Sequence, residues 1–168
     1  MPLNLKPLSY EAIPGALARV ERYRLLGEPE QAESICQDIL RCDPGHQEAL
    51  IFLILAITDQ FEGGSGARVS EARDVLPRLR DQYSRAYYAG IISERRARAL
   101  INQVSLRAGS AAYDWLRDAM DDYERAEAIR PAGNDDAILR WNTCARFLNS
   151  HPHLAPKPEE RLEPILLE

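Results

Sequence analysis

The sequence predicts an all-α fold of about seven helices. Apolar residues recur at helical spacing in most of the chain, as in the run AESICQDILRC, and this period is the main sign of an amphipathic helix. Sustained alternation of apolar and polar residues, which is typical of a strand, is nearly absent. The 168 residues are enough for one domain with a hydrophobic core.

The first two helices are expected at residues 14–26 and 29–41. Pro14 and Pro29 suit the first turn of a helix, because the N–H that proline lacks would be unbonded there. Gly27 is expected to end the first helix, since glycine readily adopts the left-handed backbone that follows a helix.

The third helix, at residues 47–59, is expected to lie in the middle of the molecule. Its centre reads ALIFLILAI and is apolar all round, and a helix with apolar residues on every face must be covered on every face.

The later helices are less sharply bounded. Ser70 is expected to cap a fourth helix that follows a glycine-rich loop, and Pro77 to kink or shorten it. Residues 108–110, Ala-Gly-Ser, are expected to form a turn. The last four helices are expected at residues 70–82, 85–107, 111–130 and 135–149.

The chain is expected to have three parts. An N-terminal extension at 1–12 precedes a helical domain at 13–150, and an extended, proline-rich tail follows at 151–168. The tail ends in an apolar cluster made of Pro164, Ile165, Leu166 and Leu167.

Composition narrows the possible partners. The formal net charge is −5, which argues against a nucleic-acid partner. No apolar run is long enough for a membrane span, and residues 1–10 lack the pattern of a signal peptide. We therefore expect a cytoplasmic protein.

The three cysteines are scattered, so they indicate inert thiols and no disulfide framework.

Small residues and a proline recur at one spacing near both ends of the helical domain. Ala119, Tyr123, Ala126 and Pro131 repeat the spacings of Ala32, Cys36, Ile39 and Pro44. Small side chains let two antiparallel helices cross closely, and the proline ends the pair.

This spacing, with Gly27 at the turn between paired helices, resembles the tetratricopeptide-repeat (TPR) family. The resemblance covers roughly residues 13–149, strongly at both ends and weakly in the middle. It implies three helix-pair repeats and a C-terminal capping helix, wound into a right-handed α-α superhelix. An ordinary helical bundle with chance matches is the alternative.

The resemblance also implies a binding surface, because in TPR proteins the first helix of each pair lines the concave face. The peptide-binding groove would be lined by Leu17, Glu21, Arg24, Ile51, Leu55, Thr58, Tyr87, Ile91, Glu94 and Arg95. An apolar strip with charged edges suits an amphipathic helix or an extended peptide with acidic flanks. The carboxylate clamp of chaperone-binding members is not expected, because apolar residues and Glu21 stand in its places.

The sequence therefore predicts a protein–protein interaction module or adaptor. It shows no nucleophile elbow, phosphate loop or zinc-spaced Cys/His set, so we expect no catalysis, no cofactor and no metal. Four aspartates between 114 and 122 indicate a solvated helix face. Two alternatives stay open. One is a self-associating scaffold whose tail docks in its own or a neighbour's groove, and the other is a small TPR chaperone for a hydrophobic client.

Overall fold

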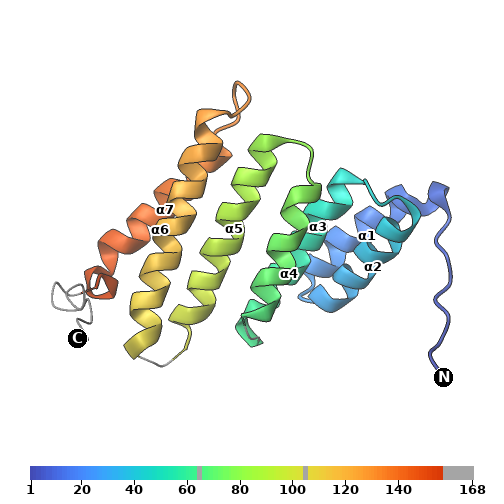
Figure 1. Cartoon of the computed structure of the whole chain (residues 1–168), viewed down its shortest axis with the longest axis horizontal. Helices are drawn as coiled ribbons and strands as arrows, with labels where there is room; N and C mark the ends of the chain where they lie inside the picture. Colours follow the sequence, from blue (N-terminus) through green and yellow to red (C-terminus); the bar gives the residue numbers. More distant parts are fainter. Residues whose placement is uncertain (64–65, 104–105, 157–168) are drawn as a thin grey trace, which may run out of the picture.

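The computed structural model describes residues 1–63, 66–103 and 106–156 (Figure 1). Seven α-helices and no strand occur in these residues, which confirms the predicted all-α fold. The helices are α1 (Ile13–Leu25), α2 (Pro29–Cys42), α3 (Gln47–Thr58), α4 (Ala67–Val75), α5 (Gln82–Ile101), α6 (Leu106–Ala128) and α7 (Asp136–Ser150).

The end of α1 shows how closely a local signal can set a boundary. Gly27 has a φ of 75°, in the left-handed region that glycine adopts without strain. The N–H of Glu28 donates to the Tyr23 carbonyl at 2.9 Å, and the N–H of Gly27 donates to the Arg24 carbonyl at 3.1 Å. These two bonds form a Schellman motif, so the helix ends where the sequence predicted.

The structure contradicts the predicted start of α4 and confirms the predicted effect of Pro77 on its end. The prediction that Ser70 caps this helix was wrong, because α4 begins at Ala67 after Gly66 and has no side-chain cap. Pro77 does shorten the helix: α4 stops at Val75, and a single 3-10 turn, Leu76–Arg78, follows it.

The predicted turn at residues 108–110 was also wrong. These residues lie inside α6, and α5 ends earlier than expected, at Ile101. A side chain built at Gly109 would lie 3.4 Å from Leu154, so the glycine makes room for a contact from beyond α7. The spacing of local turn residues could not show that contact.

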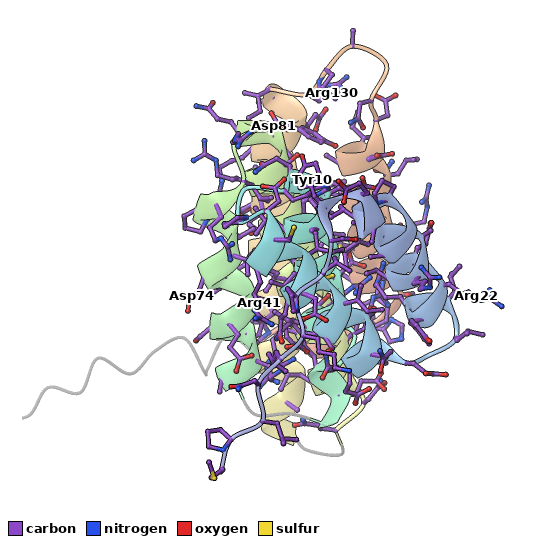
Figure 2. The ribbon with its side chains drawn as sticks, turned by 90° about the vertical axis from the view of Figure 1, so that its right-hand side faces the viewer. Tyr10, Arg22, Arg41, Asp74, Asp81 and Arg130 are labelled. Atoms are coloured by element: carbon purple, nitrogen blue, oxygen red, sulfur yellow. The ribbon has the colours of Figure 1, made fainter. Side chains whose placement is uncertain are left out.

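The helices pack in two layers. Helices that follow one another contact each other, and α3 also contacts both α1 and α5, so the odd-numbered helices lie on one side of the molecule (Figure 1). Seen from the α1–α2 end, Arg22 of α1 and Asp74 of α4 point away from the molecule on opposite sides (Figure 2). We call the surface formed by α1, α3, α5 and α7 the odd-helix face.

Two main clusters of buried side chains hold the layers together. The first joins α1 to α4 with part of α5, and α3 supplies six of its buried residues. This agrees with the central place predicted for α3, although Ile51, Phe52 and Leu55 stay partly exposed. The second cluster joins α5, α6 and α7 around Tyr123 and Met120.

Helices α5 and α6 approach closely at Gly90. A Cβ atom at this position would lie 2.5 Å from the Tyr123 ring, so only glycine fits. The small repeat residues Ala32, Ala119 and Ala126 are also fully buried. They allow the same kind of close crossing elsewhere.

The chain after α7 is less extended than predicted. Pro152–Leu154 form a 3-10 turn, because proline suits the first position of such a turn. Leu154 is buried. The His151 ring stacks on Phe147 with centroids 4.1 Å apart. Residues 157–168, which include the apolar cluster at 164–167, lie outside the described residues.

Candidate functional site

The ten residues predicted to line a groove come from three neighbouring helices of the odd-helix face, but they differ in exposure. Leu17, Ile51, Leu55 and Tyr87 are partly exposed, as are Arg24 and Arg95, while Glu21 is exposed. Thr58, Ile91 and Glu94 are buried. These three residues therefore support the surface from below and do not form it.

An ion cluster connects α1, α3 and α5 on this face. Asp59, at the C-terminal end of α3, accepts a hydrogen bond from Arg24 Nε at 2.7 Å and a second bond from Arg95. Arg95 also donates to the Thr58 hydroxyl at 2.7 Å and to the Leu55 carbonyl at 3.2 Å. Burial, together with Arg24 and Arg140 nearby, lowers the pKa of Arg95 in spite of Asp59.

A second ion cluster connects α5, α6 and α7 around Glu94, which is 2% exposed. The Tyr123 hydroxyl donates to Glu94 Oε2 at 2.7 Å. Arg98 donates to Glu94 Oε1 at 3.2 Å, and Arg140 Nη1 lies 3.5 Å from the same oxygen. Burial and the Glu94 charge raise the pKa of Tyr123 far above its usual range, so its hydroxyl stays protonated.

The two clusters leave positive charge on the odd-helix face of an acidic protein. Four arginines share two carboxylates there, because Arg24 and Arg95 share Asp59, and Arg98 and Arg140 share Glu94. Burial alone would lower the pKa of Arg140, but Glu94 and a hydrogen bond with Tyr87 raise it. The Arg140 guanidinium therefore stays charged, and an acidic group is the natural complement of this surface.

Apolar and aromatic surface lies beside these arginines. Leu17 and Ile51 pack on the first core cluster, and Leu55 and Tyr87 on the second. The Tyr87 ring stacks on Tyr83 at 5.7 Å and meets Tyr88 edge-on at 5.1 Å. These contacts fix the tyrosine orientation.

A notch between α5 and α7 extends this surface. It has a volume of about 190 Å³ and is lined by Tyr87, Asp136, Leu139, Arg140 and Thr143; we call it the α5–α7 notch. Tyr87 was predicted to belong to this surface, but the four residues of α7 were not, because the TPR resemblance implies a capping role for that helix. Leu139 and Arg140 lie four and three residues before Thr143, so the three side chains share one helix face. This spacing was the signal in the sequence that could have located them.

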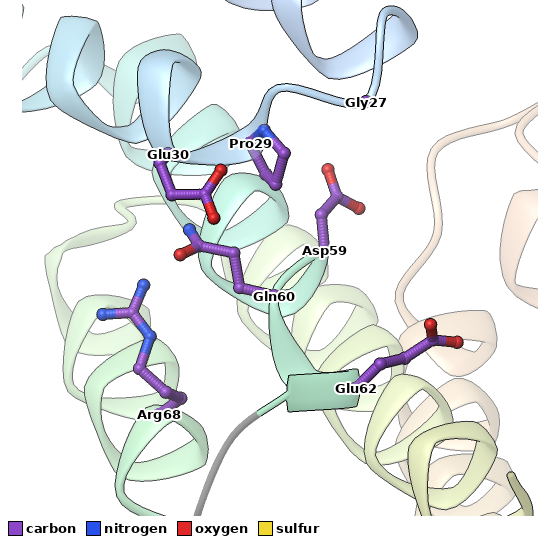
Figure 3. A pocket seen from close by; sticks show the side chains of 7 residues that line it. All are labelled: Gly27, Pro29, Glu30, Asp59, Gln60, Glu62 and Arg68. Atoms are coloured by element: carbon purple, nitrogen blue, oxygen red, sulfur yellow. The ribbon is translucent and has the colours of Figure 1, made fainter.

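Another cavity, of about 460 Å³, opens beside Gly27 at the turn between α1 and α2 (Figure 3). Its lining is mostly polar, with Glu30, Gln60 and Arg68 pointing into it. Gln60 and Arg68 both donate to Glu33, at 2.6 and 2.5 Å. The polar groups of Gln60 and Arg68 are therefore already bonded within the chain.

The side chains of Cys36, Cys144 and His46 have structural roles in the fold. Burial raises the pKa of Cys36 and of Cys144 to about 12, so both thiols are protonated and unreactive at neutral pH. His46 caps α3, with Nδ1 accepting from the Ala49 N–H at 3.2 Å. Within residues 1–63, 66–103 and 106–156, no group of three His, Cys, Asp or Glu could hold a metal ion.

The acidic face of α6 is solvated as predicted at Asp114, Asp118 and Asp121, which are exposed, but not at Asp122. Asp122 is 7% exposed and pairs with Arg125. Arg73 of α4, Asp118 and Asp121 line the same small cavity.

Among the described helices, none is both long and apolar enough to cross a membrane. No family model, curated protein or solved structure matches the chain.

Proposed function

We propose that the chain is a protein–protein interaction module that binds an acidic, partly apolar polypeptide segment on the odd-helix face. The observation that carries this proposal is the sharing of two carboxylates by four arginines, next to partly exposed Leu17, Ile51, Leu55 and Tyr87. The TPR resemblance of the sequence supports the same surface.

The two ion clusters favour binding without a large rearrangement. Each guanidinium group is already held by a carboxylate from a neighbouring helix or from its own helix, so little side-chain entropy is lost when a partner arrives. The apolar strip adds contact area, and the arginines select for acidic flanks. Binding should weaken as salt concentration rises.

Affinity purification from the native cell, followed by mass spectrometry, tests the proposal. Leu17→Glu and Ile51→Glu place a negative charge on the strip, so both should lose a stoichiometric partner that the unaltered chain retains. Ile129→Glu is the matched control, because Ile129 is 49% exposed and follows α6, outside the odd-helix face. Thermal melting of each variant separates lost binding from lost folding.

The purified chain should be a monomer that retains one partner. A dimer without any partner would contradict the proposal and favour the self-associating scaffold. Loss of the partner from Ile129→Glu to the same extent would show that the odd-helix face is not the binding surface.

A further inference from the structure

We infer that the α5–α7 notch is the subsite that takes one acidic residue of the partner together with a neighbouring apolar residue. The inference rests on the proposed function and names the part of the odd-helix face that selects the partner.

Arg98 and Arg140 carry more positive charge than Glu94 balances, and this excess can pair with the acidic residue of the partner. The single buried carboxylate of Glu94 faces Arg98 and Arg140 through the same oxygen, Oε1, while its other oxygen accepts from Tyr123. The side chains of Arg98 and Arg140 are 42% and 40% exposed. Each guanidinium has five N–H donors, so donors remain for a carboxylate that arrives from solvent.

The apolar residue is matched by Tyr87 and Leu139. The Tyr87 ring is held by its contacts with Tyr83 and Tyr88, and Leu139 is 62% exposed. The notch volume of about 190 Å³ is below the roughly 300–1,000 Å³ of small-molecule sites. The space therefore suits polypeptide side chains better than a cofactor.

Asp136 gives the subsite a direction. It lies at the start of α7, about one helical turn before Arg140, and its charge repels a carboxylate at that end of the notch. The acidic residue is therefore placed near Arg140, and the apolar residue against Leu139 and Tyr87.

Two labelled synthetic peptides test this assignment by fluorescence anisotropy with the full chain. Both have 12 residues (about three helical turns) and leucines on one helical face. The first carries glutamates on the other face, and the second carries glutamines. Arg140→Gln should weaken binding of the glutamate peptide by about tenfold or more, because a charged hydrogen bond is lost. It should leave binding of the glutamine peptide unchanged.

Leu139→Ser should weaken binding of both peptides several-fold, and because Leu139 is largely exposed, it should leave the melting temperature almost unchanged. Arg146→Gln is the matched control, since Arg146 is an exposed arginine on another side of α7 and its loss should change neither affinity. Arg140→Lys keeps the charge without the planar fork and should fall between Arg140→Gln and the unaltered chain.

The failures can be told apart. If the glutamate peptide binds the unaltered chain and neither Arg140→Gln nor Leu139→Ser weakens it, the notch is not the subsite, while the proposed function stands. If neither peptide binds the unaltered chain, and purification from the cell yields no partner, the proposed function itself is wrong.

Discussion

Tyr123 is the residue on which the close approach of α5 and α6 depends. Its ring covers Gly90, and its hydroxyl donates to the buried carboxylate of Glu94. The side chain is therefore held on its face by the backbone of α5 and at its tip by an ion cluster. Tyr123 was predicted as a structural repeat position, but its partner in the helix crossing, Gly90, was not predicted.

Gly90→Ala should destabilise the chain by about 1–3 kcal/mol, because the added methyl group overlaps the Tyr123 ring and overpacks the crossing. Urea unfolding followed by circular dichroism measures the effect. Gly15→Ala is the control, since its methyl group would meet only the end of the Arg19 side chain at 3.4 Å. This control should stabilise α1 by up to about 1 kcal/mol. Equal stability of both variants would contradict the close approach.

Asp122 is a buried carboxylate whose contribution to the free energy of unfolding depends on pH. Burial raises its pKa from 3.8 to about 6, and neither Arg125 nor Arg73 offsets this effect. The native chain therefore holds the proton more tightly than the unfolded chain does. The contribution of this group to stability then falls as pH rises from about 4 to about 6.

Asp122→Asn should remove this dependence. Relative to the unaltered chain, the variant should gain about 2–3 kcal/mol between roughly pH 4 and pH 7. Loss of the Arg125 contact lowers the stability of the variant at every pH, so it does not change how the gain depends on pH. Urea unfolding across the pH range measures this dependence. A flat difference for Asp122→Asn would show that its carboxyl has an ordinary pKa.

At the scale of the element, helix ends followed from sequence where the signal is local. Gly27 and Pro77 act through their own backbone geometry, so the ends they impose could be predicted. Ser70 and residues 108–110 carry turn-forming types, but they lie inside helices. At Gly109 the Leu154 side chain packs close to the helix. Local propensity is weak enough for packing to override it.

Helices α5, α6 and α7 are tied together by Glu94, and this tie should be measurable. Tyr123→Phe should cost about 1–3 kcal/mol, because it leaves a buried carboxylate oxygen without its donor. Glu94→Gln should weaken the same contact. In a double-mutant cycle the two effects should be non-additive by at least about 0.5 kcal/mol. Additive effects would mean that the two residues stabilise the helices independently.

Tyr83→Phe is the matched control for this cycle, because Tyr83 donates to Asn134 at 3.3 Å and makes no contact with Glu94. Its effect should add to that of Glu94→Gln.

At the scale of the whole molecule, two core clusters meet where α3 and α5 pack. Ion pairs across this junction, such as Arg95 with Asp59, reinforce the apolar contacts. The odd-helix face crosses the same junction, so a partner bound there would contact both halves.

The tail offers a competing occupant for this face, and its removal tests that alternative. If the tail docks in a groove, deleting residues 159–168 should change the oligomeric state or raise the binding of a hydrophobic dye, because an apolar strip becomes exposed. Replacing Ile165, Leu166 and Leu167 by serine should have the same effect without shortening the chain. Unchanged light scattering and dye binding in both variants would contradict docking.

The sequence by itself determined the all-α class, the number of helices and most of their ends, because helical period, glycine and proline act through local geometry. It also identified Tyr123 and the small residues at the helix crossings. Only the tertiary structure decided that Glu94 and Asp122 are buried, that four arginines share two carboxylates, and that α7 forms a notch with α5. Those features depend on side chains far apart in the chain, whose encounters no local pattern records.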